Sequence, residues 1–105
     1  MDKEISVNEA AKLRASSEAI FLDVREPNEL SICSIENSLH IPMGEIPNRV
    51  EHLPKDKDLI VFCHHGMRSM QVVNFLQARG FENAINLGGG IHAWAIEQDP
   101  KMDKY

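Results

Sequence analysis

Three short and mostly apolar runs constrain the fold of this chain more than any other feature of its sequence. They cover residues 19–24, 59–62 and 84–87, and each is bounded by polar or turn-forming residues. Runs of this length are typical of strands, and a run without regular polar alternation fits a strand that is buried on both faces. We therefore expect three strands inside a parallel sheet, with a further short strand at residues 38–41.

Helical patterns separate these strands. Ser6 and Glu9 have the spacing of a capping box, which predicts a helix that continues to about Ser16. Pro27 stands where a first helical turn tolerates proline, and Gly80 stands where a helix C-terminus favours glycine. Apolar spacing predicts further helices at residues 46–53, 69–79 and 91–95.

Alternating strands and helices predict an α/β fold, a small mainly parallel sheet flanked by helices on both faces. Residues 1–105 are interpreted as a single domain, with a core at about 5–98 and a polar C-terminal tail at 99–105 that we expect to be frayed. The sequence contains no internal repeat and no long linker.

Charge and hydropathy exclude some classes of partner. The net charge of -5 argues against a general nucleic-acid binder, and no apolar stretch approaches the roughly 20 residues that span a bilayer. The charged start Met1-Asp2-Lys3-Glu4 does not resemble a secretory signal. Two cysteines, Cys33 and Cys63, make no disulfide framework, so we expect a reducing, cytoplasmic location.

Chemically distinctive residues follow each of the three long strands. These segments are Asp23–Arg25, Cys63–Arg68 and Gly88–Gly90. In open α/β sheets ligands bind beyond the carboxyl ends of the strands, and those ends meet at one edge when the strands are parallel. We expect a single site that combines all three segments.

The middle segment predicts a nucleophile within an anion-binding loop. A short loop between a strand and a helix turns backbone N–H groups inward, and the helix N-terminus adds partial positive charge, which favours the thiolate of Cys63. Gly66 permits a tight turn, and Arg68 adds a permanent positive charge. A cysteine at a strand end is often only a small buried apolar residue, but this glycine, arginine and helix start favour chemistry.

The sequence resembles the rhodanese homology family over roughly residues 5–98. Several separated motifs carry the resemblance in the family's order: Leu22-Asp23-Val24-Arg25 with Glu29, Ile41-Pro42, Val61-Phe62-Cys63 through Gly66, Arg68 and Ser69, Gly80-Phe81, and Leu87-Gly88-Gly89 with Ala93-Trp94.

The resemblance implies a sulfurtransferase that works through a persulfide on Cys63. A small anionic sulfur donor such as thiosulfate would load the cysteine, and cyanide or a thiol would accept the sulfur, with a sulfur-relay protein as a candidate partner. Asp23 and Arg25 are expected to hold the loop in position without touching the substrate. The alternative is that they form an ordinary surface ion pair. The loop residues that we expect to bind substrate are His64, His65, Gly66, Met67, Arg68 and Ser69.

Some residues depart from the family pattern. Cys33-Ser34 replaces a Gly-His pair, Asn37 replaces a glycine and Ser38 an alanine, so the geometry of the turn before the short strand is open. We interpret Cys33 as inert; a resolving disulfide between Cys33 and Cys63 is the sharper alternative.

Two other functions are weighed against catalytic sulfur transfer. A cysteine phosphatase uses a longer loop than the four residues that separate Cys63 from Arg68, and the loop offers no obvious general acid. A persulfide carrier or binding module, loaded by a partner protein, is harder to separate from an enzyme by sequence.

No metal or cofactor is predicted. Three adjacent residues, Cys63 to His65, cannot easily direct three ligands to one tetrahedral ion. His40, His52 and His92 show no nearby ligand set in the sequence, and Trp94 has the helical spacing of a core residue. The glycines at 88–90 lack the spacing of a nucleotide-binding loop.

Overall fold

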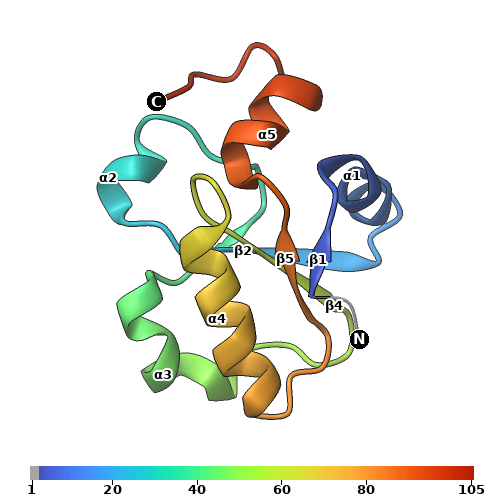
Figure 1. Ribbon diagram of the computed structural model, residues 1–105, viewed down its shortest axis with the longest axis vertical. Coiled ribbons are helices and arrows are strands. Elements are labelled where there is room, and N and C mark those ends of the chain that lie inside the picture. Colours follow the sequence, from blue (N-terminus) through green and yellow to red (C-terminus); the bar gives the residue numbers. More distant parts are fainter. Residues whose placement is uncertain (1–2) are drawn as a thin grey trace.

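The chain folds around a five-stranded parallel sheet, as seen in a computed structural model that describes residues 3–105 (Figure 1). Met1 and Asp2, the beginning of the charged start, lie outside the described residues. The strand order is β1-β5-β4-β2-β3, and every neighbouring pair is parallel. The predicted fold class is confirmed. The strands are β1 (Glu4–Ile5), β2 (Ala19–Asp23), β3 (Leu39–His40), β4 (Asp58–Phe62) and β5 (Ala84–Leu87).

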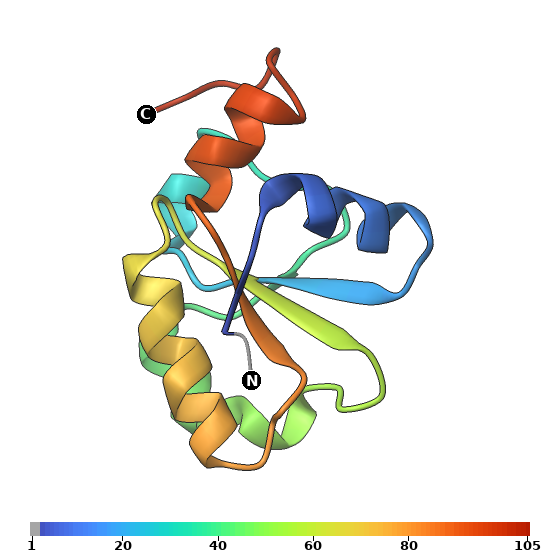
Figure 2. The same cartoon turned by 45° about the vertical axis from the view of Figure 1, so that its right-hand side comes forward.

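Helices cover both faces of the sheet. Figure 2 shows α1 and α5 on one side of the strands and α3 and α4 on the other. No helix formed by the described residues has the length and apolar character that crossing a membrane requires. The helices are α1 (Val7–Ala15), α2 (Pro27–Leu30), α3 (Ile46–Arg49), α4 (Met67–Ala78) and α5 (Gly90–Glu97), with 3₁₀ turns at Met43–Glu45 and Val50–His52.

The central strand β4 is apolar from Leu59 to Phe62 because both of its faces are buried. Leu59 and Val61 of β4 belong to a core cluster that includes residues of α4, whereas Ile60 and Phe62 belong to a second cluster that includes Trp94 of α5. Successive side chains of a strand point to opposite faces, and here both faces are buried. Trp94 is 7% exposed, which confirms its assignment to the core.

The ends of several helices follow the sequence signals. Ser6 caps α1 and its side chain accepts a hydrogen bond from the Glu9 amide, as the capping box predicts. Gly80 follows α4 with a φ of 92°, in the left-handed region that glycine favours after a helix. The predicted helix at 46–53 is instead a short α-helix followed by a 3₁₀ turn, and it ends before Pro54 as expected.

The strand β1 was not predicted. Its two residues pair with β5, Glu4 opposite Asn86 and Ile5 opposite Leu87. A two-residue strand is too short to produce a periodic pattern. Its position depends on the neighbouring strand rather than on its own sequence.

The C-terminal segment is bound to the domain rather than frayed. It follows α5 and returns toward α2, where the chain ends (Figure 1). The hydroxyl of Tyr105 donates to a Glu29 carboxylate oxygen at 2.7 Å and accepts from Arg25 Nη1 at 2.9 Å. The expectation of a frayed tail was wrong, because a polar composition does not reveal that one aromatic residue has partners elsewhere in the domain.

Candidate active site

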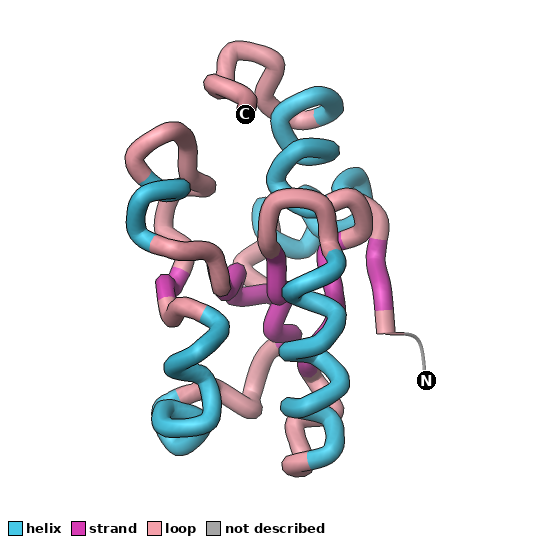
Figure 3. Tube along the Cα trace, turned by 60° about the vertical axis from the view of Figure 1, so that its left-hand side comes forward, coloured by secondary structure: helices cyan, strands magenta, loops and turns pink. Residues whose placement is uncertain are grey.

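The loop after β4 lies at the edge of the sheet where the parallel strands end. It occupies the space between α2 and α5 in Figure 1, and it leads directly into α4, as Figure 3 shows. Asp23 ends β2 and the glycines 88–90 follow β5, so the three segments singled out in the sequence lie at the same edge.

Two backbone N–H donors and one hydroxyl group converge on the sulfur of Cys63, which is 1% exposed. The Gly66 amide lies 3.1 Å from Sγ, the Ser69 amide 3.4 Å, and the Ser69 hydroxyl 3.3 Å. Gly66 has a φ of 108°, which only glycine adopts at low cost, and this turn aims its N–H at the sulfur. The arrangement can hold a negatively charged sulfur atom.

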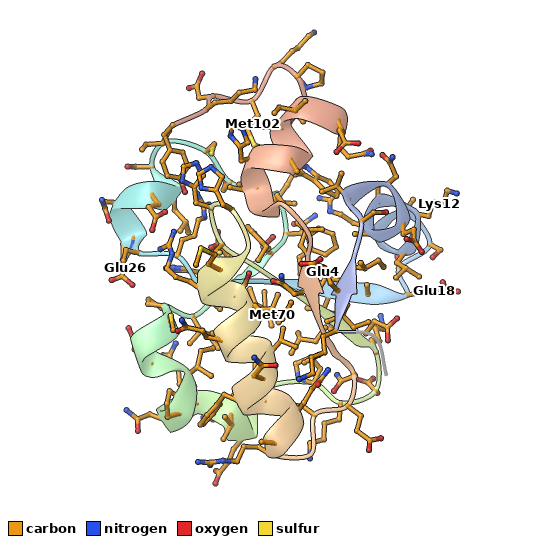
Figure 4. The ribbon with its side chains drawn as sticks, viewed as in Figure 1. Glu4, Lys12, Glu18, Glu26, Met70 and Met102 are labelled. Carbon is orange, nitrogen blue, oxygen red and sulfur yellow. The ribbon has the colours of Figure 1, made fainter. Side chains whose placement is uncertain are left out.

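A buried asparagine fixes this arrangement from β5. The Asn86 amide group donates to the Gly66 carbonyl at 3.2 Å and to the Glu4 carboxylate at 3.0 Å, while its oxygen accepts from the Ser69 hydroxyl at 2.5 Å. Glu4 is labelled on β1 in Figure 4. Sequence reasoning missed Asn86, and the available signal was a polar residue within an otherwise apolar strand.

Helix α5 holds the loop from the other side. The Ile91 amide donates to the Cys63 carbonyl at 2.9 Å, and the His92 amide donates to the His64 carbonyl at 3.1 Å. Gly90 has a φ of 63°, and a Cβ atom there would lie 2.5 Å from the His64 carbonyl oxygen. The glycine run therefore allows the start of α5 to approach the loop backbone closely.

Arg68 contacts Glu29 of α2 rather than the sulfur. Its two terminal nitrogens lie 2.7 and 2.9 Å from the two carboxylate oxygens of Glu29. Hydrogen bonding from Arg68 lowers the pKa of Glu29 to about 2, and hydrogen bonding to Glu29 raises the pKa of Arg68. The pair is ionised at neutral pH, so Glu29 offsets the positive charge that the sequence places in the loop.

Asp23 and Arg25 form a buried pair, not a surface one. Their exposures are 1% and 0%, and Arg25 binds both carboxylate oxygens of Asp23 at 2.8 to 3.2 Å. Arg25 also donates to the Glu29 and Cys33 carbonyls at 3.3 and 2.9 Å. The pair thus contacts the residues around α2, and Asp23 also pairs with Phe62, the residue that precedes Cys63.

The other side chains of this segment are exposed or contact other rings. Met67 is 79% exposed. The rings of His64 and His65 lie together, with centroids 3.8 Å apart, and the ring of Tyr105 stacks on His64 at 3.7 Å and 8°. Burial, followed by the nearby charge of His65, lowers the pKa of His64.

One expectation about the histidines was wrong. The sequence shows no ligand set near His92, but in the structure its ring centroid lies 5.0 Å from that of His65. The three residues His64, His65 and His92 are the group within the described chain whose geometry could hold a metal ion. The sequence does not show this proximity, because α5 reaches the loop only through the fold.

The turn that departs from the family pattern keeps a left-handed backbone. Asn37 has a φ of 66°, a conformation that asparagine tolerates better than most residues. Both cysteines are free thiols, and Cys33 lies beside Arg25, with 4.0 Å between Sγ and Nη1.

Comparisons with known proteins agree with this geometry. A rhodanese-like domain is matched over residues 6–97. YtwF of Bacillus subtilis is 42% identical over 90 residues, which cover 86% of each chain. The thiosulfate sulfurtransferase GlpE of Coxiella burnetii is 33% identical over 94 residues, covering 90% of this chain and 88% of that protein. The structure of the human single-domain sulfurtransferase TSTD1 superposes with a TM-score of 0.85 at 25% identity, covering 93% and 99% of the two chains. The chain belongs to the rhodanese-like domain family, which includes proteins named as sulfurtransferases.

Proposed function

We propose that this protein transfers sulfane sulfur through a persulfide on Cys63, with thiosulfate or a persulfide as donor and cyanide or a thiol as acceptor. The observation that carries the proposal is the convergence of two backbone N–H donors and the Ser69 hydroxyl group on the buried Sγ. A persulfide and a thiolate are both anionic sulfur species, and both are stabilised by such donors.

The proposed reaction has two half-reactions. The Cys63 thiolate attacks the outer sulfur of thiosulfate, the sulfur–sulfur bond of the donor breaks, and sulfite leaves with the electron pair. The acceptor then attacks the outer sulfur of the persulfide, and the Cys63 thiolate is restored; with cyanide the product is thiocyanate. Covalent catalysis of this kind predicts ping-pong kinetics.

The surrounding residues have separate proposed roles. The amides of Gly66 and Ser69 and the Ser69 hydroxyl hold the sulfur. Arg68 contributes charge at the mouth of the loop, attenuated by Glu29. The His64, His65 and Met67 side chains form the rim, and Asp23 and Arg25 position the α2 side of the site. A reducing compartment such as the cytoplasm suits a reaction that needs a free thiol.

The relation between Arg68 and Glu29 also favours a second candidate, a persulfide carrier that a partner protein loads. A site whose arginine is already paired with a carboxylate attracts a doubly charged donor less strongly. Such a carrier accepts sulfur from a desulfurase but turns over thiosulfate slowly.

Intact-mass measurement tests the proposal. Wild type, Cys63→Ser and Cys33→Ser are incubated with thiosulfate and then with cyanide. We expect wild type and Cys33→Ser to gain about one sulfur atom and to lose it with cyanide, whereas Cys63→Ser gains none. If only a desulfurase loads the protein, the carrier function holds. If neither donor loads it, sulfur transfer is refuted, and aryl phosphate hydrolysis dependent on Cys63 would instead support a phosphatase.

A further inference from the structure

Three histidine side chains meet beside the loop, and two of them have ring nitrogens without a partner. The candidate ligand nitrogens of His64, His65 and His92 all lie within 4.8 Å of one another. His64 Nε2 and His92 Nδ1 are buried, and neither has a hydrogen-bond partner within residues 3–105. A buried polar atom without a partner is costly, so these two nitrogens call for a ligand.

The backbone that carries the rings is fixed before any ligand binds. The His92 amide is bonded to the His64 carbonyl at 3.1 Å, which ties α5 to the loop at this point. The Tyr105 ring stacks on His64 and restrains its orientation. His65 is exposed and is therefore free to adjust its ring. The backbone of all three residues and the ring of His64 are therefore held in place, and the exposed ring of His65 can close onto a ligand.

The nitrogen triangle is small enough for a single ion. Tetrahedral coordination with metal–nitrogen bonds of about 2.0 to 2.1 Å separates neighbouring ligand nitrogens by about 3.4 Å, so nitrogens that lie within 4.8 Å of one another need to approach by at most about 1.4 Å. Neutral imidazole is a ligand of zinc, copper and nickel.

We propose that His64, His65 and His92 form a binding site for one divalent late transition-metal ion, such as Zn²⁺ or Ni²⁺. Its protein ligands are imidazole nitrogens alone, which leaves coordination positions open to solvent or to a small ligand. The site differs from the thiolate centre at Cys63. It does not depend on the proposed sulfur transfer, and either proposal can fail without the other.

Calorimetric titration of the full chain with Zn²⁺ and Ni²⁺ tests the site. The titrations use a Cys63→Ser background, which removes the thiolate as a competing ligand. We expect one ion per chain in this background, and an affinity that falls by more than about 10-fold in His92→Asn, since even indirect partners of a metal cost this much. The control His52→Asn changes an exposed histidine of the 3₁₀ turn and should bind as the background does.

A His65→Asn variant and imidazole ¹⁵N resonances provide two further tests of the metal site. His65→Asn removes an exposed ligand without disturbing the core, so its loss of affinity supports the site even if His92→Asn folds poorly. Imidazole ¹⁵N resonances report the ligands directly, and Zn²⁺ should shift those of His64, His65 and His92 but not that of His52. Binding that vanishes in Cys63→Ser, or that survives unchanged in both His65→Asn and His92→Asn, would overturn the proposal.

Discussion

The carboxylate of Glu29 engages both terminal nitrogens of Arg68, at 2.7 and 2.9 Å, and so links α2 to the first turn of α4 across the loop that carries Cys63. The Glu29 side chain is 13% exposed, and that of Arg68 is 38% exposed. Because one partner is shielded and the contact is bidentate, the pair is stronger than an ordinary surface ion pair.

Glu29→Gln should improve the capture of an anionic donor. The change leaves the positive charge of Arg68 uncompensated, while the sulfur cradle keeps its separate support from Asn86. We expect KM for thiosulfate to fall by about two- to fivefold at low salt, with a smaller effect at high salt. Steady-state kinetics measure this, with Glu51→Gln as an exposed control. A higher KM would show that Glu29 acts mainly by orienting Arg68.

The same pair predicts a pH dependence of stability. The pKa of Glu29 is lowered from its ordinary 4.5 to about 2, so the folded state favours the ionised carboxylate. The contribution is complete above about pH 4.5 and is lost as the pH falls toward 2. Denaturant unfolding of wild type and Glu29→Gln should therefore give a stability difference that is constant near neutral pH and shrinks below pH 4.5. A difference that grows on acidification would contradict the assignment.

Ser69→Ala should slow persulfide formation without unfolding the domain. It removes the hydroxyl that lies 3.3 Å from Cys63 Sγ and that donates to Asn86 Oδ1, but keeps the Ser69 amide. Because the sulfur loses this polar neighbour and the loop loses its link to Asn86, we expect a rate loss of about 10- to 100-fold. Single-turnover loading with thiosulfate measures the rate. Ser38→Ala is the control, because its buried hydroxyl has no partner among residues 3–105.

Gly90→Ala should deform the active-site loop. The new Cβ would lie 2.5 and 2.6 Å from the carbonyl oxygens of His64 and Cys63, at a φ of 63°. We expect a loss of about 1 to 3 kcal/mol in the free energy of unfolding and a loss of sulfur loading. Gly44→Ala is the matched control, since nothing lies within 4 Å of its added Cβ. Equal stability of the two variants would show that α5 does not lie as close to the carbonyl oxygens of Cys63 and His64 as these distances indicate.

Tyr105→Phe should loosen the C-terminal segment. It removes the hydrogen bonds of the hydroxyl to Glu29 and Arg25 but keeps the ring that stacks on His64. A loss of about 1 kcal/mol corresponds to a fall in Tm of about 4 to 8 °C in a domain of this size. Calorimetry measures Tm, with Lys101→Ala as an exposed control in the same segment. An unchanged Tm would mean that the segment contributes nothing through this hydroxyl.

The parts of the fold that could be predicted were those whose signals are local. The strand at Leu59–Phe62 is apolar because both of its faces are buried, and the helix after Ser6 begins with a capping box. The loop after Cys63 combines a glycine and a helix start within a few residues, so its inward amides could also be expected.

Contacts between distant segments could not be predicted in the same way. Asn86 reaches Ser69 and Gly66 only because β5 lies beside β4, and the sequence of residues 84–87 does not indicate those partners. His92 and Tyr105 meet the loop through the docking of α5 and the segment after it. The pairing of Arg68 with Glu29 likewise depends on where α2 lies. Each of these contacts is decided by tertiary packing.

The hydrogen bonds from Ile91 and His92 to the carbonyls of Cys63 and His64 have a consequence for the order of folding. β2, β4 and α4 can pair and pack before the C-terminal helix is in place, but the loop backbone lacks these two donors until α5 docks. A nascent or partly unfolded chain therefore presents its cysteine without the finished enclosure. The enclosure of the thiol is therefore complete only when α5 has docked, and we expect the reactivity of Cys63 toward alkylating agents to report on that docking.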